Sequence, residues 1–216
     1  MASNAALQWQ DGRGWLVLAG SASDTVRARA LGIAAADGGI AYLATQGVNA
    51  SVEQILTDME DLGAPSGYLV DVLTEDDSVI QSKLAEASMI VIGGDPSVTN
   101  VRSALLGAGI AGIQEAFENG AVVLAEGLAA MAFGAWLLQD DGQINSGVGW
   151  LSSGLIVPGI ASVSESPVTR IVMAAQPSAI AIGIGAESAL ALGPDGEVQT
   201  WGEQQVSIAL GPTFGA

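Results

Sequence analysis

The chain has 216 residues and a mass of 21.6 kDa; half of its residues are hydrophobic, and 23 acidic against 6 basic side chains give a formal net charge of −17 at pH 7. This size and composition predict a single α/β domain over residues 1–216 with a substantial core, and they exclude wholesale disorder. The acidic balance argues against nucleic acid or an anionic membrane surface as a partner, since both require clustered Lys and Arg.

The sequence contains neither Cys nor His. Without Cys there is no disulfide, thiolate nucleophile or Cys-bound metal, and without His the commonest general base and metal ligand are missing. We therefore expect no metal and no cofactor, and a Ser–His or Cys–His catalytic pair is impossible within this chain. Residues 1–13 lack the basic start and apolar core that are typical of a signal peptide, so we expect none; the longest uncharged run, 142–164, is broken by Asn, Pro, Gly and Ser. The expectation is a cytoplasmic protein without membrane insertion.

Five short apolar runs recur along the first part of the chain. They are Trp15–Ala19, Ile40–Ala44, Tyr68–Val72, Met89–Ile92 and Ala121–Ala125. Runs of this length and composition are typical of strands buried on both faces, as in a parallel sheet.

Helical patterns separate these runs. In 52–62 the apolar side chains share one helix face. Ser51 with Gln54, and Ser78 with Gln81, have the spacing of a capping box at a helix N-terminus. The alternation of strand and helix over residues 14–139 predicts right-handed βαβ units and a doubly wound, mostly parallel sheet with helices on both faces.

The rhythm changes after about residue 145. Short β-like runs occur at Arg170–Ala174, Ala179–Ile184, Ala189–Leu192, Glu197–Trp201 and Val206–Leu210. Residues 193–196, Gly-Pro-Asp-Gly, form a hairpin signal between two of them, because Pro presets the turn and Gly permits its backbone. We expect a C-terminal antiparallel β extension attached to the parallel sheet.

Ligands bind beyond the carboxyl ends of the strands in an open parallel sheet. The loops to inspect are therefore 20–23, 46–49, 93–96 and 126–130. The last of these follows a predicted strand and opens an apolar helix expected to continue through Leu138. This strand–turn–helix context is that of a nucleophile elbow, in which a sharp turn exposes a catalytic Ser.

Four segments, in order, resemble the peptidase S51 family. Residues 88–96 (SMIVIGGDP) and 120–131 (GAVVLAEGLAAM) are similar to its Gly-Gly-Asp-Gln-like loop and to the strand that leads into Gly-Thr-Ser-Ala-Gly. Residues 147–151 (GVGWL) and 181–192 (AIGIGAESALAL) are similar to its Gly-Leu-Gly-Leu-Leu and Gly-Ile-Gly-Ile-Asp-Glu-Asn-Thr-Ala-Leu. The family includes cyanophycinase and aspartyl dipeptidase, and its fold is similar to class I glutamine amidotransferases. The resemblance covers about residues 14–210.

Carried over by position, the family's catalytic residues are missing. Its serine falls on Leu128, or on Ala129 if the alignment shifts by one. No Ser, Thr or Cys occurs between Leu105 and Asn145, so no local realignment restores a hydroxyl or thiol.

The other positions of the family's site are also changed. The family's aspartate and histidine fall on Pro158 and Ile160, and the Gln of its Gly-Gly-Asp-Gln loop falls on Pro96. The vestigial site positions are Gly93, Gly94, Asp95, Pro96, Glu126, Gly127, Leu128, Ala129 and Ile160.

Two parts of this site, the loop 93–95 and Glu126, each have two interpretations. Gly93, Gly94 and Asp95 are interpreted as a tight turn, with anion binding by backbone N–H groups as the alternative. Glu126 is interpreted as a carboxylate that caps the following helix, with catalysis as the alternative.

The missing chemistry predicts a catalytically inactive relative of this family with a structural or binding role. We expect it to act by self-association, as a dimer or a larger homo-oligomer, with contacts to other protein chains also open. Two alternatives remain. One is a peptide hydrolase that uses an unorthodox nucleophile, such as Ser152 or Ser153, with a carboxylate base; the other is a regulatory partner of an active homologue.

Overall fold

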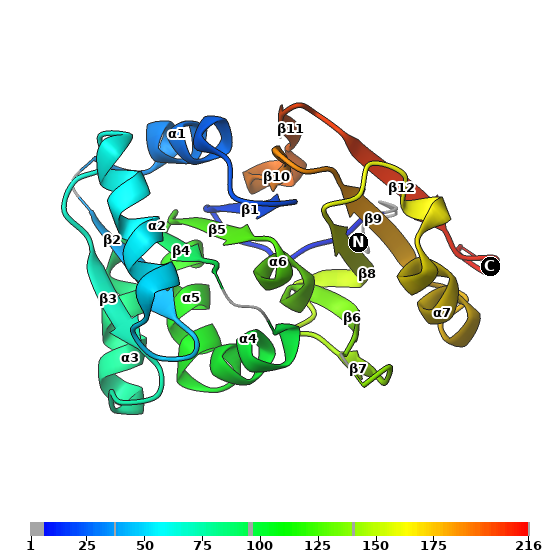
Figure 1. Ribbon diagram of the computed structural model, residues 1–216, viewed down its shortest axis with the longest axis horizontal. Coiled ribbons are helices and arrows are strands. Elements are labelled where there is room, and N and C mark those ends of the chain that lie inside the picture. Colours follow the sequence, from blue (N-terminus) through cyan, green and yellow to red (C-terminus); the bar gives the residue numbers. More distant parts are fainter. Residues whose placement is uncertain (1–6, 37, 95–96, 140, 216) are drawn as a thin grey trace.

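The computed structural model describes residues 7–36, 38–94, 97–139 and 141–215 (Figure 1). Its strands form a seven-stranded sheet in the order β11-β10-β1-β5-β4-β2-β3 and a five-stranded sheet in the order β12-β9-β8-β6-β7. The strands are β1 (Trp15–Ala19), β2 (Gly39–Ala44), β3 (Tyr68–Asp71), β4 (Ala87–Ile92), β5 (Val122–Glu126), β6 (Gly134–Leu138), β7 (Ile144–Ser146), β8 (Leu151–Pro158), β9 (Ile180–Ile184), β10 (Ser188–Leu192), β11 (Val198–Gly202) and β12 (Val206–Leu210).

Helices cover both faces of the larger sheet. They are α1 (Asp24–Ile33), α2 (Ala50–Asp61), α3 (Asp77–Ala85), α4 (Val98–Leu105), α5 (Ala108–Glu118) and α6 (Leu128–Ala132), whereas α7 (Pro167–Ala175) packs against the five-stranded sheet. Among the residues described, no helix is long and apolar enough to cross a membrane.

The five predicted strand runs form the parallel core of the larger sheet, so this part of the prediction is confirmed. Strands β1, β5, β4, β2 and β3 pair in parallel with one another. Along β1, Val17 and Ala19 pack with α1 and α2, whereas Leu16 and Leu18 pack with α3, α4 and α5 on the opposite face. Burial on both faces explains why the inner strands β1, β2 and β4 are almost entirely apolar, whereas the edge strand β3 is half-buried and ends at Asp71.

The predicted antiparallel extension is also present. Strand β10 pairs antiparallel with β1, and β11 pairs antiparallel with β10. The turn at 193–196 joins β10 to β11, and its Asp195 and Gly196 have φ of 58° and 82°, the left-handed conformation that this turn requires.

Part of the C-terminal region forms a separate sheet that the sequence did not predict. Strands β6, β8 and β9 are parallel, with β7 and β12 antiparallel at the edges. Strands β9 and β12, expected to extend the parallel sheet, belong to this second sheet. Its inner face shares a core with α5 and the larger sheet, where Trp150 packs against Phe117 and Phe133.

Two predicted element types are wrong. The helix expected through Leu138 ends at Ala132, and residues 134–138 form β6 instead. An apolar run without helical periodicity fits either element, and here pairing with β8 decides the outcome. The strand expected at Arg170–Ala174 lies inside α7, which begins with a proline at its first position and buries Thr169 and Val172.

The predicted helix caps are displaced. Helix α2 is capped by Asn49, whose side-chain oxygen accepts hydrogen bonds from the N–H groups of Ser51 (3.0 Å) and Val52 (3.3 Å). Ser51 therefore lies inside the helix rather than at its cap. Helix α3 starts after Asp76, so Ser78 is its second residue and not its cap.

Candidate functional site

The loops at the carboxyl ends of β1, β4 and β5 surround a crevice of about 640 Å³. Its lining includes residues 20–22, Gly94 and residues 126–128, and the first turns of α2 close it from one side. The connection after β1 leads to α1 and that after β5 leads to α6, which pack on opposite faces of the sheet. Ligands bind in open α/β sheets where adjacent connections diverge in this way.

A larger hollow of about 1090 Å³ lies near the opposite ends of β1 and β5, where residues 7–13 meet the turn at 193–196. In this sheet architecture functional groups lie at the carboxyl ends of the strands, where the crevice of 640 Å³ lies. The 640 Å³ crevice also contains the buried charged residues Arg27 and Glu126. We therefore treat the smaller crevice as the candidate site.

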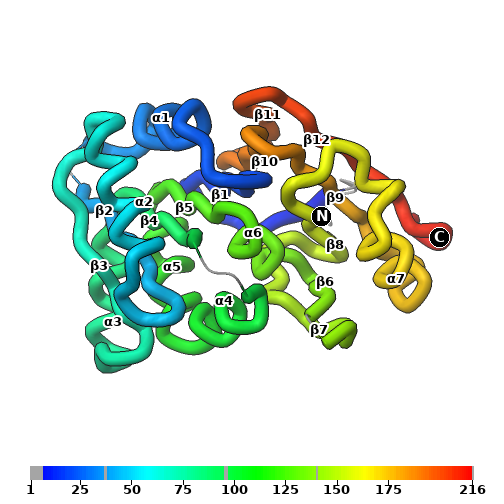
Figure 2. The backbone as a smooth tube through the Cα atoms, in the orientation of Figure 1, coloured from blue at the N-terminus to red at the C-terminus, as the bar shows by residue number. Residues whose placement is uncertain are grey.

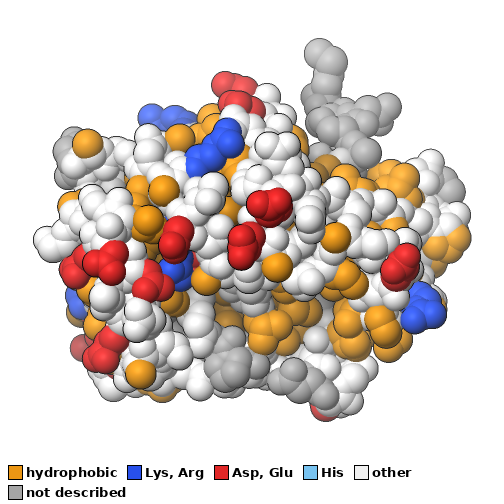
Figure 3. Space-filling view, turned by 45° about the horizontal axis from the view of Figure 1, so that its top comes forward, with side chains coloured by type: hydrophobic (Ala, Val, Ile, Leu, Met, Phe, Trp, Pro, Cys, Tyr) orange, Lys and Arg blue, Asp and Glu red, His pale blue; other side chains and the backbone are white. Residues whose placement is uncertain are grey.

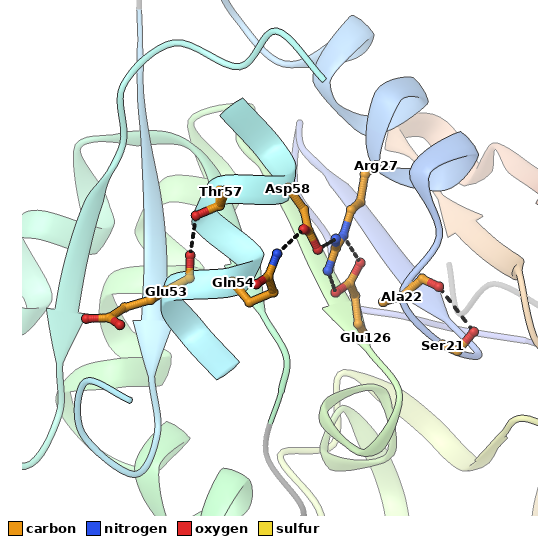
Figure 4. A network of polar contacts seen from close by, with 8 residues as sticks. All are labelled: Ser21, Ala22, Arg27, Glu53, Gln54, Thr57, Asp58 and Glu126. Atoms are coloured by element: carbon orange, nitrogen blue, oxygen red, sulfur yellow. Dashed lines mark hydrogen bonds and ion pairs between the residues drawn. The ribbon is translucent and has the colours of Figure 1, made fainter. Parts of the chain in front are cut away.

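An arginine with two carboxylates forms the floor of the crevice (Figure 4). The Arg27 Nε and Nη2 donate to Glu126 Oε1 and Oε2, each at 2.8 Å, which is a bidentate ion pair. The Arg27 Nη1 donates to Asp58 Oδ2, also at 2.8 Å. Arg27 is 2% exposed and Glu126 is 5% exposed. The cluster thereby ties α1, α2 and β5 together beneath the crevice.

The contacts in the cluster shift the pKa values of Arg27 and Asp58. Burial alone would lower the pKa of the Arg27 guanidinium, but hydrogen bonds and charges from Glu126 and Asp58 outweigh it and raise this pKa. The hydrogen bond from Gln54 Nε2 to Asp58 Oδ1, 2.7 Å long, and then the contact with Arg27 lower the pKa of Asp58. Arg27 therefore stays charged, and it cannot act as a base.

The turn between β5 and α6 has the geometry of an elbow. Its strained residue is Gly127, with φ 58° and ψ −125°. In a nucleophile elbow the catalytic side chain occupies this sharp position. Gly127 carries no side chain, and a Cβ added there would meet no atom of the described residues within 4 Å. The resemblance to the S51 family placed its serine on Leu128, whereas the backbone conformation expected of a nucleophile belongs to Gly127.

The residues on either side of this turn have structural contacts. Leu128, the first residue of α6, lines the crevice, and Ala129 is buried in the core below it. The sequence predicted that Glu126 caps α6, and this prediction is wrong. The N-cap of α6 is Gly127 without any side-chain hydrogen bond, because the Glu126 carboxylate faces Arg27 instead.

The two glycines after β4 allow close packing. A Cβ on Gly93 would lie 3.1 Å from Glu126 Oε2, and one on Gly94 would lie 3.1 Å from the Cβ of Ser51. Gly94 also has a φ of 74°, which favours glycine. These close contacts account for glycine at both positions. Asp95 and Pro96, also predicted at this site, lie outside the described residues.

Other predicted residues lie away from the crevice lining. Ile160 follows β8 and packs in the apolar cluster that includes Leu155, Val163 and Val172. Its N–H donates to the Ile184 carbonyl at 3.1 Å, and Pro158 is the last residue of β8. The crevice lining therefore includes Leu128 but not Ile160.

Ser152 and Ser153 form part of a bulge near the start of β8. Both are exposed, and Ser153 has a φ of 58°. The Ser152 N–H donates to the Gln8 carbonyl at 2.9 Å. Neither serine lines the crevice, so the fold does not join them to the buried carboxylates.

Sequence reasoning missed Arg27 and Asp58 altogether. Arg27 lies between Val26 and Ala30, the buried apolar residues of α1. An arginine between apolar residues on the buried face of a helix is the one sequence signal that could have identified it. Among the described residues, no group of three or more His, Cys, Asp or Glu could hold a metal ion.

No family model and no curated protein matches the sequence. Among solved structures, the fold is similar to a peptidase from an acI-B1 actinobacterium, with 18% identity, a TM-score of 0.72, and coverage of 94% of this chain and 96% of that chain. It is also similar to a putative peptidase E from Listeria monocytogenes EGD-e, with 16% identity, a TM-score of 0.66, and coverage of 88% and 98%. The chain therefore has a peptidase E-like α/β fold with a mostly parallel main sheet.

Proposed function

We propose that this chain is a non-catalytic protein on a peptidase-type fold, and that its role is structural, through association with itself. One observation carries the first half of the proposal. The elbow position where a nucleophile would stand is Gly127, and the residue before it is an acid paired to a buried arginine.

Serine peptidase chemistry needs a nucleophile, a base within hydrogen-bond reach and donors for the oxyanion. The hydroxyls that line the crevice belong to Ser21 and Ser51. The Ser21 Oγ accepts a hydrogen bond from the Glu187 N–H at 3.2 Å and donates one to the Ala22 carbonyl at 3.4 Å. The carboxylates of the crevice floor already accept hydrogen bonds from the Arg27 guanidinium. This arrangement supports a crevice without an activated nucleophile.

The surface supports the second half of the proposal. Only 13% of the residues are charged, and large apolar side chains remain exposed on several elements. They are Ile33, Val48, Leu73, Val79, Leu106, Ile171, Val198, Ile208 and Leu210. Two of them, Ile208 and Leu210, lie on the same strand, and contiguous exposed apolar surface marks sites that bind other chains.

A hydrolysis assay tests the non-catalytic half. Purified protein is incubated with aspartyl dipeptides and blocked peptides, and released amines are measured. We expect no turnover. Turnover that survives purification and disappears in Ser21→Ala, Ser51→Ala, Ser152→Ala or Ser153→Ala would overturn the proposal in favour of a hydrolase with an unorthodox nucleophile.

The mass of the purified protein tests the structural half. Sedimentation equilibrium should give a mass of at least two chains of 21.6 kDa each. A monomer that associates only after an active homologue is added would favour the regulatory alternative, and a monomer under both conditions would refute the role by association.

A further inference from the structure

Strand β12 is a sheet edge without the usual protection. It lies at the outer border of the five-stranded sheet, with β9 on its other side (Figures 1 and 2). Natural proteins blunt exposed edge strands with charged residues, prolines, bulges or short length, because open N–H and C=O groups recruit other strands. Strand β12 spans five residues, Val-Ser-Ile-Ala-Leu, with no charge and no proline. Its register with β9 is continuous and has no bulge.

The hydrogen-bond register identifies which backbone groups point outward. The Gly185 N–H donates to the Gln205 carbonyl, and the Gly211 N–H donates to the Ala179 carbonyl. Antiparallel pairs alternate between bonded and non-bonded positions, so the odd-numbered residues of this strand face β9. The backbone groups of Ile208 and Leu210 therefore point away from the sheet. The two residues are 59% and 56% exposed.

The other three sheet edges are different. Strand β3 has four residues and ends at Asp71, and β7 has only three residues. Strand β11 lies between Glu197 and Glu203 in the sequence, and its Gln199 is engaged by the Arg29 side chain at 2.6 Å. Strand β11 also has five uncharged residues and an exposed Val198, but an acidic residue lies immediately before and after it. Of the edges that the structure describes, β12 alone carries two exposed large apolar side chains without a charged residue immediately before or after the strand.

Charge indicates which partner fits this edge. A second copy of a chain with a net charge of −17 is repelled over most of its surface. No strand of the five-stranded sheet carries a charged residue, and no Asp, Glu, Lys or Arg follows Glu203. Figure 3 shows most of the visible acidic side chains at the left and centre, with hydrophobic side chains gathered toward the end that holds this sheet. The short 3-10 helix Val163–Glu165, which contacts β12, carries one exposed acid, Glu165, so two copies oppose few like charges at this edge.

We propose that two copies of this chain pair through β12 in an antiparallel arrangement, with the two-fold axis at Ile208. In this register Ile208 faces Ile208 of the second copy, and Val206 faces Leu210. The strand complements itself, as an isologous interface requires, and the two five-stranded sheets become continuous. The inference rests on the proposed self-association and specifies its surface.

Cysteine cross-linking tests the register. The chain has no cysteine, so Ile208→Cys introduces a single thiol. Directly opposed residues in a bonded antiparallel pair have Cα atoms about 5.5 Å apart, within the roughly 4.4–6.8 Å that a disulfide spans. We expect mild oxidation to convert Ile208→Cys to a covalent dimer. Val198→Cys, on the exposed edge strand β11, is the matched control and should remain uncross-linked.

A charge variant tests the energetics. Ile208→Lys places two like charges opposite each other and should raise the dimer dissociation constant at least about tenfold. Val198→Lys makes the same charge change elsewhere and should leave association unchanged. Circular dichroism checks folding. If Ile208→Lys fails to fold, Leu210→Lys at the same edge replaces it.

The outcomes separate the two proposals. A wild-type assembly that persists in the folded β12 lysine variants, without cross-linking at position 208, would overturn pairing through β12 and leave self-association standing. A wild-type protein that remains monomeric at high concentration would overturn both proposals. A monomer that binds only a different chain through β12 would replace the second copy as the occupant.

Discussion

Removing the arginine beneath the crevice should strongly destabilise the fold. In Arg27→Met the methionine side chain fills the space of the aliphatic part of arginine. Glu126, which is 5% exposed, nevertheless loses both hydrogen bonds from the guanidinium. Breaking a buried ion pair by removing one partner typically lowers the free energy of unfolding by about 3–5 kcal/mol, because the remaining charge is uncompensated. We expect a loss in that range, with the protein still folded in the absence of denaturant.

Two further variants show whether the unpaired buried charge is the cause. Arg27→Met combined with Glu126→Leu removes both charges, and it should be a few kcal/mol more stable than Arg27→Met alone, since apolar replacement of a whole buried pair is close to neutral. Asp58→Asn should lower stability by only about 1 kcal/mol or less, because the Asp58 side chain is 34% exposed.

Urea unfolding followed by fluorescence of the five tryptophans measures these differences by linear extrapolation. The coupling energy comes from the double-mutant cycle of Arg27→Met and Glu126→Leu. A loss below about 1 kcal/mol in Arg27→Met, or a double variant less stable than both single variants, would refute the assignment of Arg27 and Glu126 as a buried, mutually dependent pair.

Three smaller predictions concern the same region. Asn49→Ala should lower the free energy of unfolding by about 0.5–2 kcal/mol, and Ser51→Ala should leave it nearly unchanged in the same urea experiment, because Asn49 is the cap; equal losses would contradict this assignment. Gly127→Ser should fold with a loss of about 1–3 kcal/mol from its positive φ and should hydrolyse no peptide for lack of a base; appearance of activity would show that a base is present. The hydrogen bond from Gln54, and then that from Arg27, lowers the pKa of Asp58 in the folded protein. The ionised Asp58 therefore contributes fully to the free energy of unfolding above the pKa of an unfolded Asp, about 3.9, and this contribution is lost as the pH falls through the lower pKa of the folded state. The stability difference between wild type and Asp58→Asn should therefore shrink in urea titrations from pH 7 toward pH 2, and a constant difference would disprove the linkage.

Local sequence patterns determined the parallel core. Strands buried on both faces must be apolar at every position, so runs such as Trp15–Ala19 were recognisable without tertiary information, and β1 has those same bounds. The hairpin at residues 193–196 was equally predictable, because its Pro and Gly restrict or release the backbone locally. Residues 134–138 were not predictable, since their apolar run suits a helix or a strand and only the neighbouring β8 selects the strand.

The candidate site depended on tertiary structure. The sequence singled out Glu126 but assigned it to a helix cap, and it passed over Arg27, which is 99 residues away along the chain. These two side chains meet because β1 and β5 are neighbours, so that α1 and the end of β5 face each other. A buried carboxylate gains more from a charged, bidentate partner than from a short helix N-terminus. Local sequence thus determined the strands and turns, whereas the pairing of distant charges was decided by the order of strands in the sheet.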